Sequence, residues 1–159
     1  MKTSEGCDAA GSSPTASRDE TLAAVRQKFQ KVLLVDDSKN LVDTLAIFFQ
    51  LDGFSARAAY GGSQAMAAYD EDVPDIAFID LVMPEVDGLA VARHVRLSRR
   101  EKPTVLVALT GWEEDPFRRD AESAGFDYFM PKPVDPASIR RFMAHLACKN
   151  MESAARETA

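Results

Sequence analysis

Cysteine is scarce in this sequence, which holds only Cys7 and Cys148 among its 159 residues. The two lie near opposite ends of the chain and form no CxxC pair, so the pattern excludes a cysteine-based zinc or redox motif. One long-range disulfide stays open as an alternative. Two unclustered thiols nevertheless favour a reduced protein, and we expect a cytoplasmic location.

Long apolar runs are also missing. No segment approaches the roughly 18 apolar residues of a membrane-spanning helix, and residues 1–20 contain no apolar stretch of the kind found in secretory signals. Positive charge is not in excess either, because 25 Asp and Glu residues outnumber 19 Lys and Arg residues, for a net charge of −6. We therefore expect no membrane insertion and no direct binding to nucleic acid.

The rest of the composition is that of an ordinary globular protein, with 46% hydrophobic and 28% charged residues. A chain of this length is enough for one compact domain. Residues 1–30 are predicted to be a disordered tail with a short helix over 19–30. The domain is predicted to span 31–149, and 150–159 to form a frayed C-terminal tail.

Apolar and helical patterns alternate along the predicted domain. Apolar runs typical of buried parallel strands occupy 32–35, 76–79 and 104–109, and weaker ones occupy 54–58 and 128–130. Helical spacing of apolar residues, or a helix stop signal, indicates helices over 41–49, 63–69, 89–98, 115–124 and 139–146. This order predicts an α/β fold, a doubly wound five-stranded parallel sheet, with its functional site beyond the carboxyl ends of the strands.

Polar residues follow four of these strands. Asp36 and Asp37 follow the first, Asp80 ends the third, Thr110 ends the fourth and Lys132 follows the fifth. Clustered carboxylates repel one another, and oxygen ligands without His or Cys favour Mg²⁺ over zinc. A nucleophilic carboxylate, a divalent cation, a lysine and a hydroxyl together suit a phosphoryl group.

Each of these residues also has a structural explanation. An aspartate after a strand is often only a helix N-cap or a turn former, as Asp36 or Asp37 could be. A single lysine before proline is usually solvated surface. Chance rarely places five such residues at four strand ends, so the set favours a functional site.

Four segments carry a resemblance to a known family: VLLVDD, FIDLVMPEVDG, ALTGW and AGFDYFMPKPV. In their order and spacing they resemble the signatures of two-component response-regulator receiver domains, over residues 31–149. The resemblance implies a flavodoxin-like (βα)5 fold with strand order 2-1-3-4-5. It also implies a stand-alone receiver, because the tail after the last predicted helix is too short for an output domain.

Site roles follow from the resemblance, residue by residue. Asp80 matches the phospho-acceptor, and Asp36 and Asp37 match the acidic pair that holds Mg²⁺ together with Asp80. The backbone carbonyl of Val82 matches a further metal ligand. Thr110 and Lys132 match the positions that contact the phosphate. Thr110 and Phe129 match the switch positions, and the Lys132–Pro133 bond matches a peptide that is cis in the family.

The resemblance also implies partners. A histidine kinase or a phosphotransfer protein would donate the phosphoryl group from a phosphohistidine. A downstream protein would bind the face formed by the fourth helix, fifth strand and fifth helix, including Phe117, and the family allows a homodimer. The chain would not be an enzyme, except that it would catalyse the phosphorylation and dephosphorylation of its own aspartate. Val82 and Trp112 would border the path by which water reaches the phosphate.

Two other functions are weighed against a receiver. A haloacid-dehalogenase-like phosphohydrolase needs an aspartate two residues after its nucleophile, where this chain has Val82 after Asp80 and Ser38 after Asp36. A phosphorylation-independent scaffold would not need all five site residues. The basic cluster within 93–102 is better explained by cations that complement a helix C-terminus than by a phosphate-backbone patch.

Overall fold

The computed structural model describes residues 18–111 and 118–158 of the chain. These residues belong to two compact units, Gln30–Asp135 and the pair of segments Met1–Phe29 and Pro136–Ala159. Trp112, Phe117 and Cys7 lie outside the described residues. No described helix is both long and apolar enough to cross a bilayer.

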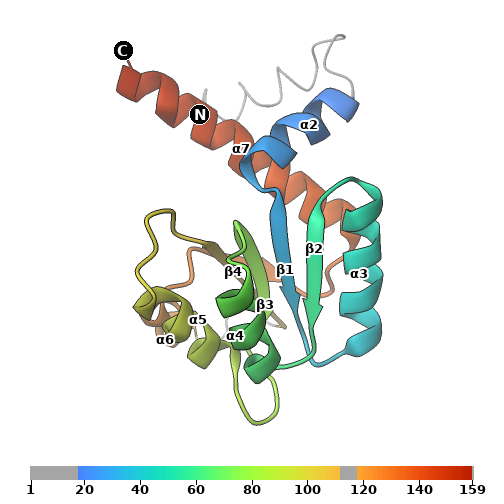
Figure 1. The fold of residues 1–159 in the computed structure, drawn as a ribbon, viewed down its shortest axis with the longest axis vertical. Coiled ribbons are helices and arrows are strands. Elements are labelled where there is room, and N and C mark those ends of the chain that lie inside the picture. The colour runs from blue at the N-terminus through green and yellow to red at the C-terminus, as the bar shows by residue number, and fades with distance from the viewer. Residues whose placement is uncertain (1–17, 112–117, 159) are drawn as a thin grey trace. The chain divides into compact units, whose positions relative to one another are not determined.

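The larger unit is built on a five-stranded parallel sheet in the order β2-β1-β3-β4-β5 (Figure 1). The strands are β1 Lys31–Val35, β2 Ser55–Ala59, β3 Ile76–Asp80, β4 Val105–Thr110 and β5 Tyr128–Pro131. All of β3 and most of β4 are buried, as their uninterrupted apolar runs predict. The fold class and the strand order predicted from the sequence are both confirmed.

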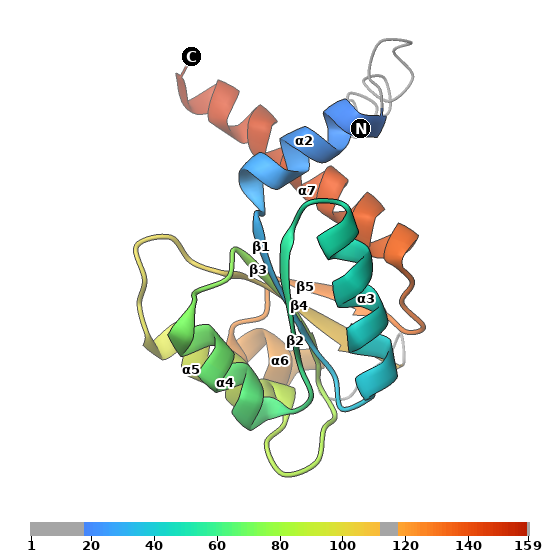
Figure 2. The same cartoon turned by 45° about the vertical axis from the view of Figure 1, so that its right-hand side comes forward.

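Helices cover both faces of this sheet, as Figures 1 and 2 show. The helices of the larger unit are α3 Lys39–Leu51, α4 Gly62–Glu71, α5 Gly88–Leu97 and α6 Arg118–Ala124. On one face, α4, α5 and α6 bury small and branched side chains such as Ala65, Val91 and Ala121 in a common core with the strands. On the other face, α3 buries its apolar stripe, which includes Leu45 and Phe49.

The smaller unit contains α2 Arg18–Lys28 and α7 Pro136–Thr158, which contact each other. The short helix predicted over 19–30 is therefore confirmed. The frayed tail predicted for 150–159 is wrong, because α7 continues to Thr158. Its last turns are rich in alanine and glutamate and contain neither glycine nor proline, so nothing in the sequence stops the helix at residue 150.

The cysteine prediction also needs correction. Cys148, in α7, is disulfide-bonded, and no described cysteine is free. The expectation of reduced thiols rested on distance along the sequence, which does not limit how close two residues come in the fold. The disulfide at Cys148 contradicts the expectation of reduced thiols.

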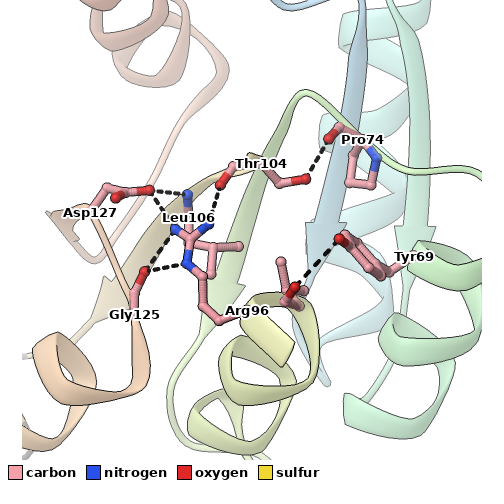
Figure 3. A network of polar contacts seen from close by, with 8 residues as sticks. Tyr69, Pro74, Arg96, Thr104, Leu106, Gly125 and Asp127 are labelled. Carbon is pink, nitrogen blue, oxygen red and sulfur yellow. Dashed lines mark hydrogen bonds and ion pairs between the residues drawn. The ribbon is translucent and has the colours of Figure 1, made fainter. Parts of the chain in front are cut away.

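A polar network ties the amino ends of β4 and β5 to the end of α5 (Figure 3). Arg96 donates from Nε and Nη2 to the Gly125 carbonyl at 3.0 and 2.8 Å, and from Nη1 to the Thr104 carbonyl at 2.9 Å. Its Nη2 also lies 2.8 Å from Asp127 Oδ2, which accepts the Leu106 N–H at 2.9 Å. One side chain thus links three segments at the edge of the sheet opposite the strands' carboxyl ends.

Candidate functional site

The carboxyl ends of the strands bring the predicted polar residues to one edge of the sheet. Asp36 directly follows β1, Asp80 and Thr110 are the last residues of β3 and β4, and Lys132 directly follows β5. Because the strands are parallel and adjacent, their ends meet at the same edge. Asp36, Asp80 and Thr110 are buried, with 1%, 6% and 7% of their surfaces exposed.

Lys132 bridges two of the carboxylates. Its Nζ lies 2.9 Å from Asp36 Oδ2 and 3.1 Å from Asp80 Oδ2. Burial lowers the pKa of Lys132, but the bonds to Asp36 and Asp80 outweigh burial and the net pKa is raised. The lysine backbone is also fixed, because its N–H donates to the Thr110 carbonyl at 2.6 Å. Lys132 is therefore a positive charge held in place between two acids.

The environment of Asp80 disfavours its charged form, and the net pKa of this carboxyl is raised. Burial raises its pKa, the Lys132 ammonium opposes that effect, and the neighbouring Asp36 adds to it. The Val82 N–H donates to Asp80 Oδ1 at 3.3 Å, so each carboxylate oxygen faces a donor. The Val82 side chain is 69% exposed and makes no acid–base group available next to Asp80.

Three carboxylates offer a site for a cation. One oxygen from each of Asp36, Asp37 and Asp80 lies within 4.8 Å of the other two. Asp36 is fixed by the Ser38 N–H, which donates to Oδ1 at 2.9 Å, while Asp37 is exposed. A donor set of carboxylate oxygens, without histidine or cysteine, fits Mg²⁺, which prefers oxygen ligands and keeps waters in its remaining positions.

Thr110 and Phe129 are neighbours on one face of the sheet. Phe129 in β5 pairs in register with Ala108 in β4, and Thr110 lies two residues beyond Ala108 on the same side of its strand. Phe129 is partly buried and packs against the core beneath α4, α5 and α6. The predicted switch pair is therefore adjacent in space.

The segment after β5 contains the cis peptide expected from the resemblance, between Lys132 and Pro133. Pro131, the last residue of β5, pairs with Thr110 on an edge strand, where a missing N–H is tolerated. The cis peptide agrees with the expectation drawn from the AGFDYFMPKPV segment, which contains Lys132.

The loop after β3 brings the end of that strand close to the start of α5. Asp87 caps that helix by accepting the Ala90 N–H on Oδ1 at 2.9 Å. A Cβ at Gly88 would lie 2.4 Å from the Asp80 carbonyl oxygen, so only glycine fits there. Glu85 adopts a left-handed φ of 68°, which the sequence did not predict because glutamate carries no signal for it.

Sequence reasoning also missed a residue beside the switch. The Arg118 guanidinium lies over the Phe129 ring, with Cζ 4.3 Å from the ring centroid. Arg118 follows the undescribed residues 112–117, and no motif links it to residue 129. Only the fold brings the two together.

The structure thus combines a parallel, doubly wound α/β sheet with an acidic cluster, a lysine and a hydroxyl at the carboxyl edge of the strands, where such folds bind their ligands. A family model of the response regulator receiver domain matches residues 32–144 of the chain. The chain therefore belongs to the receiver-domain family of response regulators.

Relatives and solved structures agree with this assignment. The transcriptional regulatory protein TrcR of Mycobacterium tuberculosis is 34% identical over 116 residues, which are 73% of this chain and 43% of that protein. The chemotaxis protein CheY4 of Vibrio cholerae has a TM-score of 0.66 at 25% identity, covering 71% of this chain and 94% of that one. This chain spans less than half the length of the curated regulators that it matches.

A third similarity is to a signalling complex. A chain in the co-crystal structure of the Saccharomyces cerevisiae histidine phosphotransfer protein Ypd1 with the receiver domain of its downstream response regulator Ssk1 matches with a TM-score of 0.66 at 25% identity. The match covers 76% of this chain and 90% of that one.

Proposed function

We propose that this protein accepts a phosphoryl group from a phosphohistidine of a histidine kinase or phosphotransfer protein and holds it on Asp80. The observation that carries the proposal is the Lys132 ammonium, 2.9 Å from Asp36 and 3.1 Å from Asp80 in a buried acidic cluster. Such a cation is suited to hold an anionic phosphoryl group beside the carboxylate that receives it.

The transfer exchanges one bond for another. A carboxylate oxygen of Asp80 attacks phosphorus, the new O–P bond forms as the N–P bond to the donor imidazole breaks, and the imidazole takes a proton from solvent. Asp36, Asp37, Asp80 and the Val82 carbonyl would hold Mg²⁺, which supplies charge neutralisation for the phosphoryl oxygens. Lys132 and the Thr110 hydroxyl would contact those oxygens.

One solved structure supports a histidine kinase or phosphotransfer protein as the partner. The complex of Ypd1 with Ssk1 joins a phosphotransfer protein to a receiver domain, and a chain of that complex is similar to this one.

We infer that the phosphorylated protein acts in the cytoplasm through contacts with a downstream protein, with Phe129 reporting the state of Asp80. The phosphoryl chemistry is confined to the chain's own aspartate, because Val82 occupies the position where a phosphohydrolase needs an acid–base group.

Intact-mass spectrometry tests the proposal directly. With Mg²⁺ and a small acyl-phosphate donor, the protein should gain one phosphoryl group, and Asp80→Asn should abolish the gain. Asp37→Ala should slow it by weakening Mg²⁺ binding, and a chelator should stop it. Asp120→Asn, an exposed aspartate on α6, is the matched control and should be labelled like the wild type. Labelling that persists in Asp80→Asn would overturn the assignment.

A further inference from the structure

The Arg118 side chain covers the ring of Phe129 at the start of α6. Its Cζ lies 4.3 Å from the ring centroid, well within the range of a cation–π contact. Arg118 Nε also lies 3.5 Å from the Glu122 carboxylate, one helical turn along α6. The guanidinium is therefore oriented by its own helix and placed against the ring.

Besides Arg118, the Phe129 ring has neighbours in the core and on the adjacent strand. Phe129 packs against the core, and Thr110 lies beside it on the same face of the sheet. A movement of the ring toward Thr110 would have to change its contact with the guanidinium, because a cation–π contact depends on the distance and direction of the cation from the ring face. The contact with Arg118 is therefore an interaction that stabilises the present position of Phe129.

We propose that Arg118 is a positioning residue that holds Phe129 in this position and thereby sets how readily the Thr110–Phe129 pair responds to phosphate on Asp80. This inference rests on the proposed function. A contact at a partly exposed site of this kind is expected to change the ratio of the two ring positions by roughly two- to fivefold. We therefore expect Arg118 to oppose the response of the Thr110–Phe129 pair. Phosphorylation of Asp80 should favour that response.

Fluorine NMR can follow the ring itself. A 4-fluorophenylalanine placed at residue 129 reports its environment in the full chain, before and after addition of Mg²⁺ and a small acyl phosphate. In Arg118→Gln, the resonance of the unphosphorylated protein should move toward that of the phosphorylated wild type. Arg118→Lys keeps a cation above the ring and should restore the wild-type resonance in part.

Arg119→Gln is the matched control, because Arg119 is exposed on the same turn and forms no ion pair with another described residue. Its resonance should equal that of the wild type. A spectrum of Arg118→Gln identical to the wild type, with Asp80 still labelled by mass, would overturn the inference and leave the proposed function intact. Absence of labelling at Asp80 in the wild type would overturn the proposed function and this inference with it.

Discussion

Replacing Arg96 by methionine removes the donors that join α5 to β4 and β5 while keeping an apolar stem of similar length. Three guanidinium nitrogens serve the Gly125 and Thr104 carbonyls at 2.8–3.0 Å, and Nη2 also pairs with Asp127. The substitution leaves both carbonyls and the carboxylate without this partner. We expect a lower free energy of unfolding with no direct effect on the phosphoryl site.

The size of the effect follows from the exposure of each acceptor. The Asp127 side chain is 44% exposed, so water replaces much of the ion pair and its loss costs little. The two carbonyls sit closer to the core, where a lost charge-assisted hydrogen bond costs about 1.5–3 kcal/mol before water compensates. The total should be about 2–4 kcal/mol, which lowers Tm by about 5–15 °C in a chain of this size.

Urea unfolding followed by circular dichroism measures this difference. Arg93→Met is the control, because Arg93 is exposed on the same helix and forms no ion pair within the described part of the chain. The control should stay within about 0.5 kcal/mol of the wild type, as surface substitutions usually do. An Arg96→Met protein as stable as the control would refute the view that this network stabilises the sheet.

Three further changes test the phosphoryl site and its supporting loop. Gly88→Ala places a Cβ 2.4 Å from the Asp80 carbonyl, so about 1–3 kcal/mol of stability and much of the phosphorylation rate should be lost, measured by unfolding and mass labelling. Asp87→Ala removes the cap of α5 and should cost about 1 kcal/mol in the same unfolding assay without abolishing labelling. Lys132→Met should raise the pKa of Asp80 further, because the ammonium now lowers it, and a carboxyl-carbon NMR titration in metal-free buffer should show a higher midpoint. An unchanged midpoint would contradict the bridging role of Lys132.

The site was predictable because its residues carry local signals. An uninterrupted apolar run such as 32–35 predicts a buried strand, and the residue after such a run lies at the sheet edge whatever the order of the strands. The pattern of residues alone therefore places the acids after β1 and the acid at the end of β3 at the same edge of the sheet, and they lie close together because β1 and β3 are neighbours. The strand order itself came from the family resemblance, and the structure confirms it.

Contacts between distant segments were not predictable in this way. Arg96 was grouped with its basic neighbours as a cation at a helix end, yet its acceptor Gly125 lies 29 residues away. Nothing near Arg118 in the sequence indicates an aromatic partner on β5. The disulfide at Cys148 was missed for the same reason, because spacing along the chain does not report distance in space.

The net charge of the site determines which cation it favours. Asp36, Asp37 and Asp80 contribute three carboxylates and Lys132 one ammonium, a formal sum of −2. A divalent cation cancels this sum, whereas a monovalent one leaves a net negative charge that is costly at the two buried acids, Asp36 and Asp80. Without Lys132 the sum would be −3, and the pKa of Asp80, which burial already raises, would lose the ammonium that now lowers it. A protonated Asp80 could not attack phosphorus, so the lysine that would contact the phosphoryl group also preserves the nucleophile that receives it.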